Sequence, residues 1–126
     1  MTLEEAVYAR HSVRSYTGEA LAKEAAFALE EEIGKCNKEG GLSIRLVQNE
    51  PKAFKSFLAK YGKFSGVTSY IVLAGEQADD LRERAGYYGE RLVLSAQTLG
   101  LNTCWAALSF GKGAAKKSAG LKKGEK

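Results

Sequence analysis

Residues 86–105, GYYGERLVLSAQTLGLNTCW, contain most of the longest helical pattern in this chain and the start of the segment that follows it. Apolar and small residues recur at helical spacing from Leu81 onward, and an acidic pair just before them suits the positive end of a helix. Gly100 is typical of a helix end. The pattern therefore predicts a helix from about Asp79 to Leu99.

Two glycines interrupt this helical pattern. Gly86 and Gly89 each cost about 1 kcal/mol of helix propensity relative to alanine, which indicates a reason for them such as the close approach of a second helix. After the helix, Leu101–Phe110 predicts a strand and exit segment. Within it we interpret Trp105 and a buried Cys104 as core packing rather than as redox partners, because a catalytic thiol needs an exposed, electropositive setting.

Two strands are predicted upstream of the long helix. Ser69–Ala74 is a continuous apolar run close to glycines, which is typical of a central strand covered on both faces. Leu42–Val47 alternates like a strand, so its three apolar residues Leu42, Ile44 and Leu46 share one face.

The remaining elements are predicted to be helices. Thr2 and Glu5 form a capping box for a short helix that ends at about Ala9. A second helix is predicted from about Glu19 to Cys36, with its acidic triplet 30–32 on a solvated face and a loop over 37–41. Pro51 suits the first turn of another helix, and a last short helix is predicted through residues 114–119.

Composition is that of one globular domain. The chain has 126 residues, of which 44% are hydrophobic and 27% charged, with a single proline. Cys36 and Cys104 lie too far apart in sequence to form a metal-ligand cluster or a disulfide framework. Glu4 and Glu5 stand where a signal peptide would be basic and then apolar, and no apolar run reaches the length of a membrane span. We therefore expect a cytoplasmic protein, not associated with a membrane.

Positive charge is concentrated at the C-terminus. Residues 111–126 form a basic tail with six lysines and one acidic residue, within a chain of net charge +4. Such a tail can neutralise phosphates, but it lacks the aromatic residues that stack on nucleic-acid bases. Binding to nucleic acid is therefore not expected.

A short segment near the N-terminus, residues 10–16 (RHSVRSY), combines two arginines with hydroxyl groups. If its backbone is extended, Arg10, Ser12 and Arg14 point to one side. Arginine grips phosphate with a planar fork of donors, and serine adds a neutral donor between the two forks. The segment is therefore either an anion clamp or a pair of solvated surface charges at a helix exit.

Residues 10–16 resemble the N-terminal flavin-phosphate motif of the FMN-dependent nitroreductases. Residues 86–105 resemble the central helix of that superfamily and the strand after it, most closely in the small branch labelled putative TM nitroreductase. The similarity covers essentially the whole chain. The two motifs in this order are fairly specific, whereas either alone is weak.

The resemblance implies an α+β fold with a mainly antiparallel central sheet flanked by helices, and FMN bound at a subunit interface or between two repeats. It implies that Arg10, Ser12 and Arg14 contact the FMN phosphate and ribityl chain, with His11 beside them. The backbone near the flavin N5 edge would come from Ala106, Ala107, Leu108 and Ser109.

The implied activity is hydride transfer from NAD(P)H to a nitroaromatic, a quinone or a similar small electron acceptor. The flavin carries out this chemistry itself, so the protein binds, orients and tunes it. No catalytic side chain and no metal are therefore expected, in agreement with a sequence that has one histidine.

The chain departs from the family pattern in three places. The loop at 36–41 replaces a proline-tryptophan segment that reaches the flavin, and Ala107-Leu108 replaces a glycine-containing turn near N5. The chain also ends where a further core strand is expected. We therefore expect residues 1–126 to be a single nitroreductase-like domain, the N-terminal part of a longer family chain, completed by a homodimer partner or a missing second half. The alternative is a flavin-binding or degenerate module without turnover.

Overall fold

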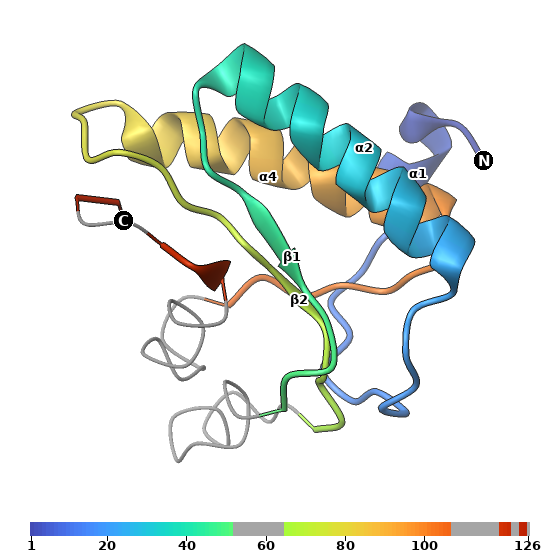
Figure 1. Cartoon of the computed structure of the whole chain (residues 1–126). Coiled ribbons are helices and arrows are strands. Elements are labelled where there is room, and N and C mark those ends of the chain that lie inside the picture. The colour runs from blue at the N-terminus through green and yellow to red at the C-terminus, as the bar shows by residue number, and fades with distance from the viewer. Residues whose placement is uncertain (52–64, 107–118, 122–123, 126) are drawn as a thin grey trace.

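The protein combines helices with a small antiparallel sheet, as the computed structural model in Figure 1 shows. The structure describes residues 1–51, 65–106, 119–121 and 124–125. In chain order, the elements within these residues are α1 (Leu3–Ala9), α2 (Lys23–Gly40), β1 (Arg45–Val47), β2 (Tyr70–Val72) and α4 (Leu81–Thr98). The predicted α+β class is confirmed, whereas the sheet in the described residues is a strand pair rather than a larger central sheet.

Helix α1 begins and ends as predicted. The Thr2 hydroxyl accepts a hydrogen bond from the Glu5 backbone N–H at 3.1 Å, and a Glu5 carboxylate oxygen accepts one from the Thr2 backbone N–H at 3.0 Å. These bonds lower the pKa of Glu5, chiefly through the backbone N–H of Thr2. Ala6 is the buried residue of this helix, and Leu3, Val7 and Tyr8 are exposed.

Helix α2 lies about four residues further along the chain than predicted. Gly18 has a φ of +82°, and the helix begins only after Ala22, whose backbone is extended. At the other end the predicted loop residue Asn37 is helical. Its side-chain amide accepts a hydrogen bond from the Ile44 N–H at 2.7 Å and donates one to the Ile44 carbonyl at 3.0 Å. The asparagine thus joins the last turns of α2 to the start of β1 instead of ending the helix.

The strand pair is shorter than the two predicted strands. β1 and β2 are antiparallel, with Leu46 opposite Ile71 at the centre of the register. A bond of 2.8 Å from the Ser43 N–H to the Ala74 carbonyl continues the pairing beyond them. Among the described residues, β1 is the partner strand of β2. β2 was predicted to be covered on both faces, but its residues are only half-buried. The reason is that β2 lines a cavity, which is described below.

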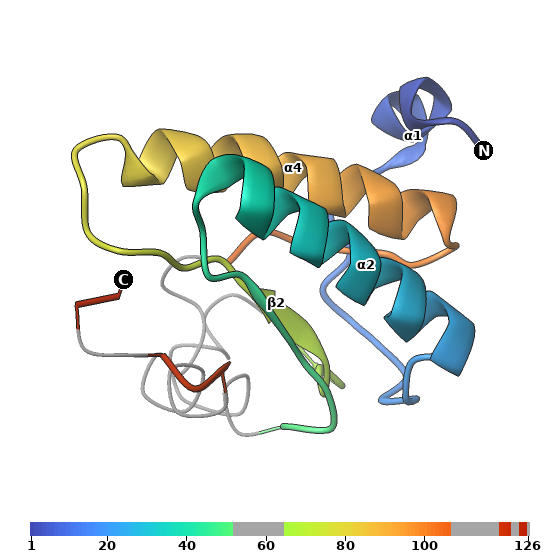
Figure 2. The ribbon, with the colours of Figure 1, turned by 45° about the horizontal axis from the view of Figure 1, so that its top comes forward.

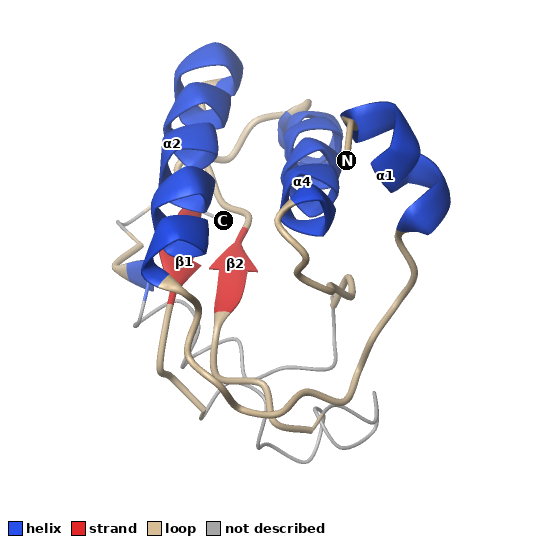
Figure 3. Ribbon diagram, turned by 90° about the vertical axis from the view of Figure 1, so that its right-hand side faces the viewer, coloured by secondary structure: helices blue, strands red, loops and turns tan. Residues whose placement is uncertain are grey.

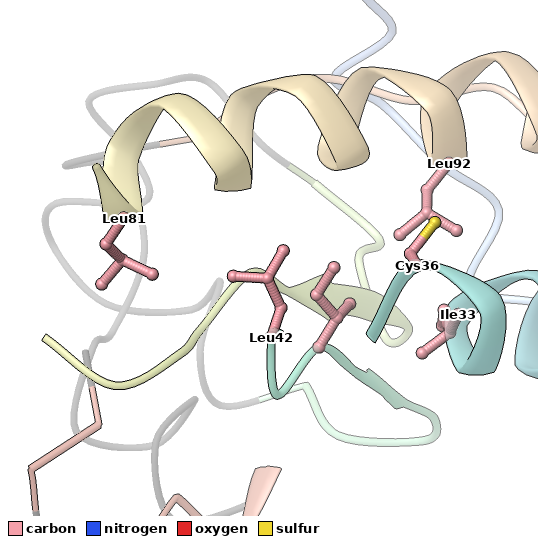
Figure 4. Packing of buried hydrophobic residues seen from close by; sticks show 6 residues of the cluster. Ile33, Cys36, Leu42, Leu81 and Leu92 are labelled. Carbon is pink, nitrogen blue, oxygen red and sulfur yellow. The ribbon is translucent and has the colours of Figure 1, made fainter. Parts of the chain in front are cut away.

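The core lies between α2, α4 and the strand pair. Figure 2 shows both helices on the same side of the strands. Figure 4 shows side chains of α4 and α2 that converge on the chain leading into β1, and the buried cluster consists of Ile33, Cys36, Leu42, Ile44, Leu81 and Leu92. Burial of each large side chain in this cluster contributes about 1.5–3 kcal/mol.

An ion-pair network also joins the two long helices. Arg91 of α4 donates to Glu32 at 2.7 Å and to Glu39 at 2.8 Å, both on α2. The prediction that the whole acidic triplet 30–32 is solvated is therefore wrong for Glu32, which is half-buried and paired.

Helix α4 is close to its predicted extent, and Gly100 follows it with a φ of +78°. The predicted reason for its two glycines is wrong. A Cβ at Gly89 would lie 2.6 Å from the Trp105 ring and 2.7 Å from Leu73 Cδ1, whereas a Cβ at Gly86 would have no atom outside the helix backbone within 4 Å. Trp105 is 45% exposed and Cys104 is half-buried, so the prediction that both belong to the core is also wrong.

Several predictions fall outside the described residues. They are the helix after Pro51, the end of the predicted strand beyond Ala106, and most of the last short helix.

Candidate functional site

The N-terminal segment 10–16 lies beside the segment that follows α4. Ser12 and Thr103 form a parallel bridge, and the Val13 N–H donates to the Thr103 carbonyl at 3.0 Å. Thus the first of the two motifs is placed next to the end of the second. This adjacency joins residues that are about 90 positions apart, which the spacing of the motifs alone does not specify.

The other edge of segment 10–16 is also paired. The Tyr16 N–H donates to the Ser65 carbonyl at 2.9 Å, and the Ser65 N–H donates to the Arg14 carbonyl at 2.9 Å. Gly66 permits this approach because it has a φ of +70°, and a Cβ there would lie 2.0 Å from the Tyr16 carbonyl oxygen. The segment is therefore extended and held along both of its edges.

Arg10 is the most unusual member of this segment. Its Nε and Nη2 atoms are buried and have no hydrogen-bond partner among the described residues. Burial of a guanidinium without partners is unfavourable, since each buried donor loses its bonds to water. A bound anion would supply the missing acceptors. Arg10 is therefore placed as a group that needs a partner of negative charge.

The neighbouring side chains remain accessible. Ser12, Arg14 and His11 are exposed, and His11 Nδ1 lies 3.3 Å from the Ala9 carbonyl oxygen. A ligand at Arg10 could therefore approach these groups from solvent.

The pKa of the Tyr16 phenol depends on its burial and on the charged residues of this segment. Burial, with a smaller contribution from Cys104, raises its pKa to about 12, and the positive charges of Arg10 and Arg14 oppose that shift. The hydroxyl donates to the Val13 carbonyl. The charges of both guanidiniums therefore lower the pKa of the same phenol.

A cavity of about 710 Å³ adjoins the segment. Val13, Ser15 and Tyr16 line it, whereas Arg10, Ser12 and Arg14 are not among its described lining residues. Its walls also come from α2, β2, α4 and residues 100–106. Val13 and Ser15 follow the alternation of an extended strand, with Arg10, Ser12 and Arg14 on its other side, whereas Tyr16 lines the cavity although it directly follows Ser15.

The predicted residues after the second motif are placed only in part. Ala106 lines the cavity, while Ala107, Leu108 and Ser109 lie outside the described residues. Sequence reasoning missed two features of the cavity wall. The Ser69 hydroxyl is buried without a partner among the described residues, and Trp105 stands against Gly89. Neither had a signal in the sequence, because both depend on contacts between distant segments.

The two cysteines differ in their surroundings. Both are free thiols, and burial raises the pKa of the Cys36 thiol, which is fully enclosed in the core. In the part of the chain that the structure describes, no group of three or more His, Cys, Asp or Glu side chains could hold a metal ion. The helices described there include none that could cross a membrane.

The chain is similar to a known protein family. A family model described as Putative TM nitroreductase matches residues 2–125 of the chain. Searches of curated proteins and of solved structures found no match.

Proposed function

The chain belongs to the Putative TM nitroreductase family, and from this premise we propose that it is an FMN-dependent oxidoreductase that passes hydride from NAD(P)H to a nitroaromatic, a quinone or a similar small acceptor. Membership places it, in general terms, among proteins of oxidoreductase kind. We extend the proposal to the architecture: residues 1–126 act as one nitroreductase-like domain built on a mainly antiparallel central sheet, and the protein works as a homodimer.

The unpaired Arg10 guanidinium carries this proposal. FMN ends in a phosphate, and arginine binds phosphate oxygens through two parallel N–H bonds. The two buried nitrogens without partners fit that role, because a phosphate would satisfy both at once. The exposed Ser12 hydroxyl and Arg14 guanidinium would add donors on the solvent side.

The chain's own residues would bind and orient the cofactor. FMN supplies acceptance and donation of hydride when it is bound, so no side-chain nucleophile is required. Arg10 and Arg14 would hold the phosphate, Ser12 the phosphate or ribityl chain, and His11 would lie beside them. The backbone at Ala106–Ser109 would pass near the reactive edge of the ring. The parallel bridge between Ser12 and Thr103 supports this division, since it keeps the two segments in register.

Titration of the purified chain with FMN tests the proposal. We expect the double variant Arg10→Ala/Arg14→Ala to weaken binding by about 3 kcal/mol or more, taking about 1.5–3 kcal/mol for each charge-assisted bond. The matched control is Arg82→Ala, because Arg82 is an exposed arginine on α4. Equal FMN affinity in the wild type and the double variant would mean that Arg10 and Arg14 are surface charges and not an anion clamp.

A second candidate is a flavin-binding module without turnover. The replacement of a glycine-containing turn by Ala107-Leu108 favours it, since side chains there would hinder a close backbone approach to the ring. NAD(P)H oxidation by the FMN-loaded chain, with a quinone or nitro compound as acceptor, separates the two. Steady turnover excludes the second candidate, and FMN binding without turnover excludes the first.

A further inference from the structure

Within the described residues, the backbone of segment 10–16 is bonded to three other parts of the chain. At its start, the Arg10 N–H donates to a backbone carbonyl of α1 at 2.9 Å. In its middle, the Val13 N–H bonds to Thr103, and toward its end the segment pairs with Ser65. In Figure 3, the loop that joins α1 to α2 passes the chain that leads into β2. The path of the segment is therefore fixed by distant parts of the chain.

The attachment at Ser65 involves the closest approach. Ser65 donates its N–H to the Arg14 carbonyl and accepts the Tyr16 N–H, each at 2.9 Å. The next residue, Gly66, has a φ of +70°, and a Cβ there would overlap the Tyr16 carbonyl group. Glycine avoids both difficulties, since it has no Cβ and adopts a positive φ at little cost. A side chain at this position would push the backbone at Tyr16 away from Ser65.

The same stretch of backbone carries the groups that need an anion. The carbonyl of Arg14 takes part in the pairing with Ser65, and Arg10 at the other end has two buried nitrogens without described partners. Several donors can bind one phosphate only if they converge on it, and a hydrogen bond weakens steeply when its angle is lost. The pairing at Ser65 therefore determines how well the Arg14 guanidinium can join Arg10 on one anion.

We propose that Gly66 is a positioning residue for phosphate binding by segment 10–16, and that it acts through the backbone of Tyr16 and Arg14. The inference rests on the proposed function, because the phosphate is taken to be that of FMN. Gly66 allows the two stretches of chain to pair before any ligand arrives. Donors that are already in place bind more tightly, since the ligand does not have to order them.

The contribution of the phosphate is measured by comparing FMN with riboflavin, which is FMN without its phosphate. We expect Gly66→Ala to lower the affinity for FMN at least about tenfold, roughly the loss of one charge-assisted bond, and to change the affinity for riboflavin little. Quenching of flavin fluorescence gives both affinities. Their ratio is the informative quantity, because a general loss of stability lowers both affinities alike.

Gly41→Ala is the matched control. Gly41 also has a positive φ, +61°, but a Cβ there would meet Arg84 Nη1 at an ordinary contact distance of 3.6 Å, away from segment 10–16. This variant introduces the same kind of backbone strain, so we expect it to lower stability and to keep the wild-type ratio of FMN to riboflavin affinity. The proposal is wrong if folded Gly66→Ala keeps that ratio, or if both variants lower it equally.

A flavin-free ligand separates this inference from the proposed function. Should the wild type bind FMN and riboflavin equally, the assignment of the FMN phosphate to segment 10–16 fails, and inorganic pyrophosphate then tests Gly66 alone. We expect calorimetry to show that Gly66→Ala binds pyrophosphate at least about tenfold more weakly than the wild type. Absence of pyrophosphate binding to the wild type, or equal binding to both proteins, would then overturn the inference.

Amide hydrogen exchange of the wild type gives the answer if circular dichroism shows that Gly66→Ala is unfolded. Because coupling between two sites is reciprocal, a phosphate that depends on the pairing at Ser65 must also strengthen that pairing. We expect saturating FMN to slow exchange of the Tyr16 and Ser65 amides more than that of the Ser43 amide, which bonds to Ala74. Equal slowing of all three is what any ligand of the folded state produces, and it would contradict the role of Gly66.

Discussion

The indole of Trp105 lies against the backbone of Gly89, so closely that a Cβ at Gly89 would come within 2.6 Å of Cη2 and 3.3 Å of Cζ2. This contact fixes the segment after α4 against the helix itself. It also places the tryptophan at the wall of the cavity, although 45% of the residue is exposed.

Substitution of the two glycines of α4 should have opposite effects. We expect Gly89→Ala to destabilise the protein by about 1–3 kcal/mol, because the added methyl group overlaps the Trp105 ring and Leu73. Gly86→Ala is the matched control and should stabilise it by about 0.5–1 kcal/mol, since the position is open and alanine favours the helix. Urea denaturation of both variants measures this. Equal effects would show that the tryptophan does not pack as described.

Replacement of Arg10 should improve the stability of the ligand-free protein. Arg10→Met removes two buried nitrogens without described partners, so we expect a gain of about 1–3 kcal/mol. Arg14→Met, at an exposed position, should change the stability little. Thermal unfolding with and without FMN tests both, because FMN should raise the melting temperature of the wild type and not that of Arg10→Met. A loss of stability in ligand-free Arg10→Met would mean that the guanidinium is already satisfied.

Stability should depend on the ionisation of Tyr16 at alkaline pH. Its pKa is raised from 10.0 to about 12 in the folded protein, chiefly by burial. The stabilising contribution of the neutral phenol is therefore complete below pH 10 and is lost as the pH rises through about 12. We expect a loss of about 1–2 kcal/mol over that interval, allowing for partial exposure. The variant Tyr16→Phe should show a shallower decline in denaturation experiments over the same interval, and an unchanged slope would contradict the assignment.

The two thiols should react at very different rates. Cys36 is fully buried and its pKa is raised by burial, whereas Cys104 is half-buried. Because the thiolate is the reactive form, a thiol-specific dye at neutral pH should modify Cys104 first and Cys36 only after unfolding. Mass spectrometry of peptides locates the label. Cys104→Ser should remove the fast phase, and a fast phase that persists in this variant would place Cys36 within reach of solvent.

The ion pairs between α2 and α4 should contribute modestly to the free energy of unfolding. Arg91 is 29% exposed and Glu32 is 21% exposed, so solvent screens their attraction in part. A double-mutant cycle with Arg91→Met and Glu32→Gln should give a coupling of about 0.5–1 kcal/mol that decreases in high salt. The pair of Glu30→Gln with Arg91→Met is the control, because Glu30 is exposed and makes no ion pair with Arg91 among the described residues. A coupling of zero for Glu32 would mean that the bond is not maintained in solution.

Elements whose ends depend on near neighbours in the chain could be predicted. The capping box of α1 is closed by residues three positions apart, and Gly100 follows the end of α4, so both helices are close to their predicted extents. The end of α2 could not be predicted in this way. Asn37 reads as a helix breaker, but its amide is used by the backbone of Ile44, which reaches it only after the chain has turned at Gly41.

In the candidate site, too, local patterns could be predicted and contacts between distant segments could not. Sequence alone identified residues 10–16 and 86–105, because each motif is a local pattern, and the family match over residues 2–125 agrees with them. The assignment of a flavin to particular residues among them remains a prediction.

The sequence by itself determined the approximate extents of α1 and α4, the α+β class and the family of this chain, since these follow from local hydrogen bonding, periodicity and motif order. Only the tertiary structure decided that Ser12 lies beside Thr103, that two nitrogens of Arg10 are buried without described partners, and that β2 lines a cavity. The physical reason is that burial and backbone pairing depend on segments far apart in the chain. The local sequence limits which bonds a residue can make. It does not specify which distant residue will be close enough to make them.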